Sequence, residues 1–338
     1  MAEADLFQPA DLSALNSFGL ALKAERYFAL DRLEQISTVH AALKGRKCLL
    51  LGGGSNFLFT RDPEEPIIAM RIKGIMVCED GEDVHLHVGA GENWHNFTEY
   101  CVDRGYGGIE NLSLIPGQVG TAPIQNIGAY GVEVRQVISY VDAFDTQQNE
   151  MRRLKKEECG FGYRDSIFKS SQKDRFWITA VGFQLSKSAP VQTAYGAIRD
   201  QLQAEGVKEP GIADVARAVT HIRKSKLPDP NELGNAGSFF KNPVLSTEHS
   251  QVLLNKYPNA PHYPATEGSK WAAGWMIEQA GWKGHRRDTH GVHDRQALVL
   301  VNYGGATGKE IFDLSRDIQR DVEKKFGVTL EREVNVYL

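Results

Sequence analysis

The stretch SLIPGQVGTAPIQNIGAYGVE, residues 113–133, has the composition of a ligand-binding wall. It contains four glycines and two prolines, it has no Cys, His or Asp, and its only carboxylate is Glu133. Small residues expose backbone N–H groups to a ligand rich in acceptors, such as a diphosphate or a flavin ring. Thr121, Gln125 and Asn126 add side-chain donors. The alternative is a structural loop packed over a sheet, but loops of this length are usually functional or disordered, and this one is too apolar for disorder.

A second glycine-rich segment, LGGGSN at residues 51–56, lies between two short strand-like runs. Gly52 and Gly54 match the first two glycines of the dinucleotide-binding fingerprint, but Phe57 stands where the third should be. The segment is no P-loop, and neither is Gly308-Lys309, which lacks the upstream glycine and a following Ser or Thr. A tight turn is the simpler interpretation, although these glycines would also let the backbone approach a phosphate.

The composition is that of an ordinary globular protein. The chain has 338 residues, of which 41% are hydrophobic and 24% charged, and its net charge is -4. This length predicts two or three domains, and the acidic balance argues against a general nucleic-acid binder. The N-terminal residues do not resemble a signal peptide, and no apolar run could span a bilayer. Four cysteines without metal spacing predict reduced thiols in a cytoplasmic protein: Cys48, Cys78, Cys101 and Cys159.

The first two thirds of the chain are rich in strand-like patterns. A helix is expected over about 92–104, because an apolar periodicity there is stopped by glycines. Period-two and apolar runs predict strands within 47–59, 67–77, 84–91, 137–145 and 176–185.

After LPDP (227–230) helices and strands alternate, so we expect a boundary near 225–230. Helices are predicted over 270–282 and 307–327, with a buried strand at 297–303 between them. The second helix has a capping box, Thr307 and Glu310, and a C-terminal Gly327. Its apolar stripe consists of Ile311, Leu314, Ile318 and Val322.

The last eleven residues, VTLEREVNVYL, alternate as a half-buried strand does. Glu333 lies on the polar face, where it is either an acid with a function or simply exposed. The residues predicted to share the other face are Val328, Leu330, Val334, Val336 and Leu338.

Three further motifs carry side chains with possible chemistry. In GYRDSIFK (162–169), Arg164 could bind a carboxylate through two parallel hydrogen bonds, or it could form a surface ion pair. In GNAGSFFKNP (234–243), Ser238 is not in a nucleophile elbow, and an isolated serine usually bonds its own backbone. GHRRDTHGVH (284–293) has three histidines, but their spacing is not that of a zinc protease, and we expect no metal.

Together these motifs resemble one family closely. LGGGSNFLF, GAGENWH, GIENLSLIPGQVGTAPIQNIGAYGVE, CGFGYRDSIFK, KLPDP, GNAGSFFKNP, WMIEQAGWKG and HDRQALVLVN occur in the order found in the UDP-N-acetylenolpyruvoylglucosamine reductases. The resemblance runs from about Asn16 to Val336, and PIQNIGAYG together with GSFFKNP is highly specific. Tyr195 in TAYGAI is similar to the loop of the longer, type I form.

The resemblance implies an α+β fold, with a two-subdomain FAD-binding module of the vanillyl-alcohol-oxidase (PCMH) type and a C-terminal α+β substrate domain. The implied parts are a first FAD subdomain at 1–70, a second at 71–226 (with the PCMH-type module over about 20–188), the substrate domain at 227–326, and a final strand at 327–338 that returns to the flavin site.

The resemblance also implies the cofactor and its contacts. FAD should bind non-covalently, because 47–59 has no histidine of the kind to which some relatives attach the flavin. The implied cofactor-binding residues are Gly52, Gly53, Gly54, Ser55, Asn56, Pro116, Gly117, Gly120, Thr121, Gln125, Asn126, Gly128, Ala129, Gly131 and Tyr163.

The implied reaction has two halves: NADPH gives a hydride to the flavin, and the reduced flavin passes it to C3 of a UDP-sugar enolpyruvyl ether. By this resemblance Arg164 stabilises the enolate, Glu333 assists, and Ser238 protonates C2. The enzyme would be a monomer without nucleic-acid or membrane partners. Implied substrate-binding residues are Tyr195, Lys226, Asn242 and Gln296.

Three other functions stay open. A flavin oxidase on the same scaffold would react with oxygen instead of NADPH, a non-catalytic sugar-nucleotide binder would not need Arg164, Ser238 and Glu333, and a zinc hydrolase would use the histidines of 284–293. Two features depart from the family pattern. Asn335 stands where an arginine is expected, and GHRRDTHGVH is unusually basic and rich in histidine.

Overall fold

The computed structural model describes residues 6–265 and 267–338, and its contacts divide the chain into two compact units. The first unit takes in the chain up to Ala10 together with Ala24–Gly53 and Glu64–Ser225. The second unit takes in Asp11–Lys23, Gly54–Pro63 and Lys226–Leu338. Each unit is therefore assembled from segments that are far apart in the sequence.

A small sheet lies at the start of the first unit. Its strands, in order, are β1 (Gln8–Asp11), β2 (Lys23–Leu30), β5 (Ile67–Met70) and β3 (Leu49–Leu51). Strand β5 pairs in parallel with both β2 and β3. All four residues of β5 are buried, as expected for a parallel strand covered on both faces. Helix α2 (Ile36–Leu43) adds its apolar side chains to the same core.

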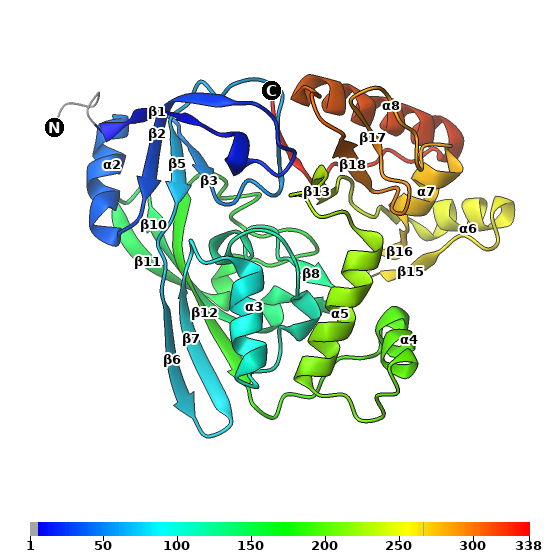
Figure 1. The fold of residues 1–338 in the computed structure, drawn as a ribbon, viewed down its shortest axis with the longest axis horizontal. Coiled ribbons are helices and arrows are strands. Elements are labelled where there is room, and N and C mark those ends of the chain that lie inside the picture. The colour runs from blue at the N-terminus through cyan, green and yellow to red at the C-terminus, as the bar shows by residue number, and fades with distance from the viewer. Residues whose placement is uncertain (1–5, 266) are drawn as a thin grey trace. The chain divides into compact units, whose positions relative to one another are not determined.

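A five-stranded antiparallel sheet forms the larger layer of the first unit (Figure 1). Its order is β11 (Glu150–Lys155), β10 (Ile138–Asp145), β12 (Phe176–Ser186), β7 (Asp83–Gly89) and β6 (Ile75–Asp80). The first eight residues of β12 are buried, which fits its central place, whereas β6 at the edge is mostly exposed. A short hairpin of β8 (Gly128–Ala129) and β9 (Val132–Glu133) lies within the 113–133 stretch.

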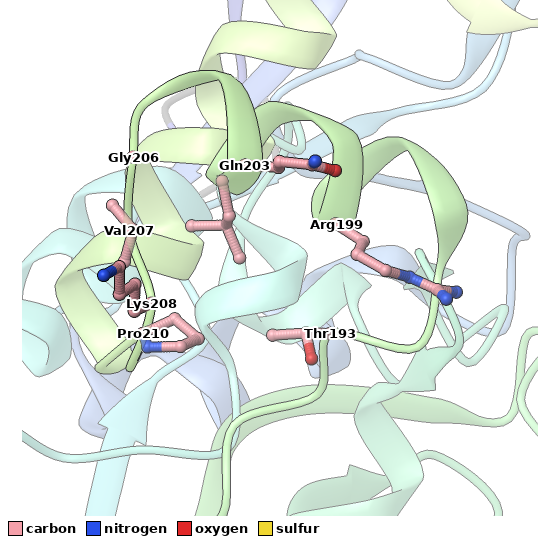
Figure 2. A pocket seen from close by; sticks show the side chains of 8 residues that line it. Thr193, Arg199, Gln203, Gly206, Val207, Lys208 and Pro210 are labelled. Carbon is pink, nitrogen blue, oxygen red and sulfur yellow. The ribbon is translucent and has the colours of Figure 1, made fainter.

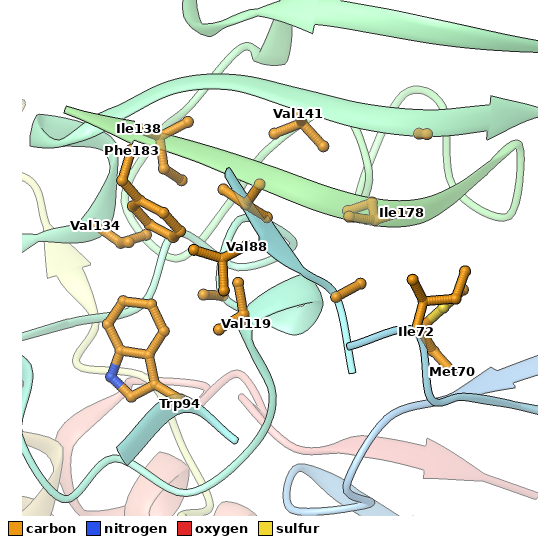
Figure 3. Packing of buried hydrophobic residues seen from close by; sticks show 14 of the residues in the cluster. Met70, Ile72, Val88, Trp94, Val119, Val134, Ile138, Val141, Ile178 and Phe183 are labelled. Carbon is orange, nitrogen blue, oxygen red and sulfur yellow. The ribbon is translucent and has the colours of Figure 1, made fainter. Parts of the chain in front are cut away.

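Three helices complete the first unit. Helix α3 (Trp94–Asp103) begins at Asn93, whose side chain accepts a hydrogen bond from the backbone N–H of Asn96. Trp94 of α3 lies in the core beside Phe183 of β12, with their ring centroids 6.1 Å apart (Figure 3). Helices α4 (Gly196–Ala204) and α5 (Ile212–Lys226) lie side by side in Figure 1 and share a small apolar cluster of their own.

The second unit contains two three-stranded sheets and one parallel pair. The sheets have the orders β13 (Gly234–Ser238), β18 (Val299–Asn302), β17 (His290–Val292) and β14 (Val244–Leu245), β16 (Gly268–Trp271), β15 (His262–Ala265). The parallel pair joins β4 (Phe57–Phe59) to β19 (Asn335–Tyr337). Its helices are α6 (Thr247–Lys256), α7 (Ala273–Gln279) and α8 (Gly308–Phe326). No helix within 6–265 or 267–338 is long and apolar enough to cross a membrane.

The predicted signals of the long C-terminal helix are confirmed. Thr307 caps α8, its hydroxyl accepts from the N–H of Glu310, and the Glu310 carboxylate returns to the N–H of Thr307. Gly327 ends the helix with a φ of 67°. The predicted stripe is fully buried and consists of Ile311, Leu314, Ile318 and Val322.

Other local predictions were wrong in part. The segment 67–77 forms two strands, β5 and β6, which belong to different sheets. The helix expected over 270–282 begins only at Ala273, because Gly268–Trp271 pairs as β16. Leu338 is 65% exposed, although Val328, Leu330 and Val334 of the same predicted face are buried. The four cysteines are free thiols, as predicted.

Candidate functional site

The first unit brings part of the 51–56 turn against the 113–133 stretch. A Cβ atom added to Gly52 would lie 2.7 Å from Cγ2 of Thr121 and 3.0 Å from Oε1 of Gln118. Gly53 faces Gly117, because its added Cβ would lie 3.7 Å from the Gly117 Cα. Two of the three adjacent glycines thus meet the stretch that the sequence paired with them, and a side chain at Gly52 would clash.

The motif GAGENWH forms hydrogen bonds with the same stretch. The indole Nε1 of Trp94 donates to the carbonyl of Leu112 at 2.9 Å, and the backbone N–H of Trp94 donates to Gly117 O at 3.0 Å. The carbonyl of Glu92 accepts from Val119 N at 2.9 Å. Glu92 and Trp94 therefore hold the first part of the stretch by three hydrogen bonds, to Leu112, Gly117 and Val119, a role that sequence analysis did not assign.

Backbone strain gathers in and beside this stretch. Of the seven non-glycine residues with positive φ among those described, four are Leu114, Asn126, Tyr130 and Arg164, with φ between 44° and 59°. Such residues cost of order 1–3 kcal/mol each, and they cluster where function requires a special backbone path. The concentration points to the same region as the glycines do.

Asn126 uses its side chain on the protein itself. The side chain is fully buried, and its amide donates to Glu133 Oε2 at 3.1 Å and to Gly162 O at 2.9 Å. Its Oδ1 accepts from Arg135 N at 3.1 Å. Because an amide has only two N–H groups, Asn126 folds the stretch onto neighbouring segments, and its direct contact with a cofactor stays a prediction.

Gln118 is the residue of this stretch that sequence analysis missed. Its side chain is 9% exposed, and its Oε1 is buried without a hydrogen-bond partner in the described chain. Thr121, whose contact with the cofactor stays a prediction, donates its hydroxyl to Gln118 O at 2.8 Å. A buried amide oxygen without a partner costs about 1–3 kcal/mol, so a bound group that hydrogen-bonds it would remove a penalty.

Arg164 occupies a two-residue turn with Tyr163. Gly162 N donates to Asp165 O at 2.9 Å across the turn, and Arg164 has a φ of 54°. Its Nη2 donates to the carbonyl of Gly128 at 2.6 Å. Two predicted site residues, Arg164 and Gly128, therefore meet, and the guanidinium is fixed at the β8–β9 hairpin.

The second unit pairs Ser238 and Glu333 through neighbouring backbone segments. Ser238 is the last residue of β13, and the next residue, Phe239, accepts a 2.9 Å hydrogen bond from Glu333 N. On the other side Lys241 N donates to Glu331 O at 2.9 Å. The two residues predicted to handle protons thus lie on adjacent segments, although 95 positions separate them in the sequence (333 − 238).

The rest of the glycine turn belongs to the second unit. Gly54 has a φ of 64°, and an added Cβ would lie 1.8 Å from Leu15 O, so only glycine fits there. Asn56 donates its side-chain amide to Glu333 O at 3.3 Å. Asn335, the departure from the family pattern, binds Asn56 O through its backbone N–H (3.0 Å) and its side chain (3.2 Å). Asn335 therefore fixes the turn beside the last strand.

The predicted substrate residues fall into two groups. In the second unit, Asn242 Oδ1 accepts from Ala273 N at 2.9 Å, and Gln296 Oε1 lies 3.2 Å from the Cβ position of Gly274, so both meet the start of α7. In the first unit, Tyr195 is 45% exposed and packs edge-on against Tyr130 at 5.2 Å. Lys226, the exposed last residue of α5, begins the last segment of the second unit.

The histidine-rich segment is packed into the second unit. His290 and His293 are 6% and 5% exposed, and burial lowers the pKa of both side chains. Arg287 forms an ion pair with Asp317 at 2.7 Å. Within the described ranges, no three Cys, His, Asp or Glu side chains group closely enough to hold a metal ion. This arrangement suits a structural segment.

A surface groove of about 370 Å³ beside α4 collects none of the predicted site residues (Figure 2). It is lined by Thr193, Arg199, Leu202, Gln203, Gly206, Val207, Lys208 and Pro210. The candidate site therefore rests on the predicted residues and the contacts described above.

The sequence matches two protein-family models. Residues 26–154 match the model described as "FAD binding domain", and residues 229–337 match "UDP-N-acetylenolpyruvoylglucosamine reductase, C-terminal domain". Curated relatives with that reductase name include a Chromobacterium violaceum protein, 49% identical over 96% of both chains, and an Amoebophilus asiaticus protein, 48% identical over 98% of this chain and 99% of the relative. This chain belongs to the UDP-N-acetylenolpyruvoylglucosamine reductase family.

Solved structures agree on the fold. The chain is similar to the UDP-N-acetylenolpyruvylglucosamine reductase of Thermus caldophilus, with a TM-score of 0.68 and 22% identity over 98% of this chain and 99% of that one. It is also similar to a solvent-stable cholesterol oxidase, with a TM-score of 0.51 and 11% identity over 97% of this chain and 86% of that one.

The predicted fold class is confirmed, with an FAD-binding module and a reductase C-terminal domain. FAD as the cofactor of this reductase is confirmed as well. The four-part domain division and the roles of the individual site residues stay predictions.

Proposed function

We propose that this reductase uses NADPH to reduce UDP-N-acetylglucosamine enolpyruvate to UDP-N-acetylmuramate, a precursor of peptidoglycan. The observation that carries the proposal is the pairing of Ser238 and Glu333 on hydrogen-bonded segments within a chain 49% identical to a named reductase. It acts in the cytoplasm, as a monomer, without nucleic-acid or membrane partners.

The residues present fit a non-covalently bound FAD. Gly53 and Gly117 face each other without side chains, and the buried Gln118 amide offers an unused hydrogen-bonding atom beside Gly52. When bound, FAD supplies two-electron hydride chemistry between NADPH and the substrate. The residues proposed to hold it are Gly52, Gly53, Gly54, Ser55, Asn56, Pro116, Gly117, Gln118, Gly120, Thr121, Gln125, Asn126, Gly128, Ala129, Gly131 and Tyr163.

Arg164 provides the positive charge for the reaction. Hydride addition at C3 of the enolpyruvyl group places negative charge on C2 and the neighbouring carboxylate. A guanidinium stabilises such a carboxylate by charge-assisted, planar hydrogen bonds. Its anchor on Gly128 O fixes one nitrogen of the fork, so less conformational freedom is lost when the substrate binds.

Ser238 and Glu333 handle the proton. The Ser238 hydroxyl donates a proton to C2, and Glu333 assists from the adjacent segment. A serine hydroxyl is a weak acid, so it can act only on a strongly basic carbon and only when it is well positioned. The positive φ of Gly237 (66°) and the pairing of Ser238 with Val299 of β18 restrain its backbone.

Four residues are proposed to bind the substrate. Asn242 and Gln296 each lie against the start of α7, and the exposed Lys226 can approach a phosphate or carboxylate. Tyr195 stands in the loop before α4, which resembles the type I form. Together they supply amide, phenol and ammonium donors for a nucleotide sugar.

The test is a product balance under air. Purified enzyme is given NADPH and the enolpyruvyl substrate, and NADPH loss, oxygen uptake and product mass are followed together. We expect one NADPH consumed for each product, which is two hydrogens heavier than the substrate. Oxygen uptake that matches NADPH loss, without the heavier product, would contradict the proposal.

A flavin oxidase with another substrate is the second candidate. A cholesterol oxidase has a similar fold, and the fold alone does not distinguish an oxidase from a reductase. The same product balance separates the two functions, because an oxidase consumes oxygen and needs no NADPH.

A further inference from the structure

Leu114, the second residue of the 113–133 stretch, has a left-handed backbone conformation that its side chain does not favour. Its φ is 59°, a region that costs a residue other than glycine about 1–2 kcal/mol. Both of its backbone polar groups are bound by side chains. Its N–H donates to Nδ1 of His95 at 3.1 Å, and its carbonyl accepts from Nε of Arg223 at 3.3 Å.

The contact between Leu114 and His95 fixes the protonation state of the imidazole. A backbone N–H can only donate, so Nδ1 of His95 must accept and cannot carry a proton. The ring proton therefore sits on Nε2, which lies 3.6 Å from the carboxylate of Glu99 one turn along α3. Only neutral His95 can hold Leu114 in this way.

Arg223 connects the two ends of the stretch. Besides donating to the carbonyl of Leu114, its guanidinium lies close to the hydroxyl of Tyr130. Tyr130 has a φ of 51°, so one arginine contacts two of the left-handed residues that bracket the predicted cofactor wall. His95 and Arg223 come from α3 and α5, which makes the path of the wall depend on these two helices.

We propose that His95 and Arg223 are positioning residues that hold the 113–133 stretch in its FAD-binding path, and that His95 does so only when neutral. The inference rests on the proposed cofactor role of that stretch. It adds two residues that act through the backbone of Leu114. Its consequence is that FAD affinity falls in acid.

The charges around His95 fit this direction. Burial lowers the pKa of His95 below its ordinary 6.5, the Glu99 carboxylate opposes that shift, and Lys224 and Arg223 add to it. Neutral His95 is therefore maintained at neutral pH, and protonation on acidification would exchange the acceptor at Nδ1 for a donor. The charged and titratable groups on α3 and α5 that line the groove beside His95 are Glu99, Asp103, Arg217, His221 and Lys224. Arg223 of α5 binds the carbonyl of Leu114, whose N–H binds His95.

The test measures FAD release from the loaded full-length protein by flavin fluorescence after dilution, from about pH 5 to about pH 8. Asn places an amide oxygen near the position of Nδ1 without titrating, whereas Gln reaches the position of Nε2 instead. His95→Asn should keep the affinity at neutral pH and lose the acid weakening. His95→Gln should weaken FAD about tenfold at every pH, the worth of roughly one hydrogen bond.

Three results decide the inference. If His95→Asn weakens in acid as the native protein does, or if His95→Gln binds FAD normally at neutral pH, the proposal is wrong. His221→Asn is the matched control on α5 and should leave the acid weakening unchanged. If the native protein held no FAD at any pH, the cofactor role itself would fail and this inference with it, which is a distinct outcome.

Discussion

The 113–133 stretch of the first unit and the paired segments 238–241 and 331–333 of the second unit differ in what they present. The first consists of glycines, strained backbone and amides whose donors are already used, as at Asn126. The second presents a hydroxyl and a carboxylate, Ser238 and Glu333, on adjacent backbone segments joined by the hydrogen bond from Glu333 N to Phe239 O. A cofactor can be bound by backbone groups, whereas proton transfer needs a side chain that can give up a proton. Variants in the two regions should therefore fail in different ways.

The largest expected effect is that of Ser238→Ala. It should keep FAD bound and NADPH oxidation fast, while the rate of substrate reduction falls roughly 10²–10⁴-fold through loss of the proton donor. Anaerobic stopped-flow absorbance measures the two half-reactions separately. Ser188→Ala, an exposed serine of the first unit, is the control. Steady turnover at the native rate in Ser238→Ala would show that the serine assignment is wrong.

Glu333→Gln should show the same division with a smaller loss. The amide keeps the shape but not the charge, so we expect substrate reduction to slow about 10²-fold at unchanged FAD affinity. Stopped-flow traces of the reoxidation step measure it. Glu331→Gln, two residues away at an exposed position, controls for charge on this segment. If only flavin reduction became slower, the assignment of Glu333 to the second half-reaction would be wrong.

In the first region, Gln118→Met should weaken FAD binding about tenfold and leave proton transfer intact. Because the buried Oε1 has no partner within the described chain, replacing it should not lower the free energy of unfolding of the FAD-free protein. Fluorescence titration and urea unfolding give the two quantities, with the exposed Gln148→Met as control. A less stable protein with native FAD affinity would show that Gln118 serves the fold.

The smallest effect concerns the histidine segment. Burial lowers the folded-state pKa of His290 and His293, so the unfolded chain binds more protons on acidification and stability should fall below about pH 6.5. Stability should be regained as pH rises through the same range. Urea unfolding at several pH values, with His290→Gln and His293→Gln, measures the change. These variants should keep both half-reactions near the native rates. Loss of either half-reaction would show that 284–293 contributes to the active site.

Local patterns predicted much of the fold. The capping residues of α8, its buried stripe and the central strand β12 follow from periodicity and end signals. What stayed hidden depends on contacts between distant segments. Nothing in 54–63 indicates that Phe57–Phe59 pairs with Asn335–Tyr337, because strand partners are chosen by tertiary packing and not by local pattern.

The candidate site divides in the same way. The glycine and amide content of 113–133 predicted a binding wall, and the structure places Gly52 and Gly53 against it. Three contacts could not be predicted, because each depends on which distant carbonyl or N–H lies nearby. They are the hydrogen bond of Trp94 to Leu112, the use of both Asn126 N–H groups within the protein, and the lack of a partner for the buried oxygen of Gln118. The histidines of 284–293 differ from this wall, because His290 and His293 are buried and the sequence pattern did not indicate their burial.

The most direct test of the central claim is an anaerobic visible spectrum of the purified protein, recorded before and after NADPH and again after the enolpyruvyl substrate. A flavin band that bleaches with NADPH and returns with the substrate is the predicted result. A colourless protein that cannot be reconstituted with FAD would contradict the assignment of 113–133 as a flavin wall.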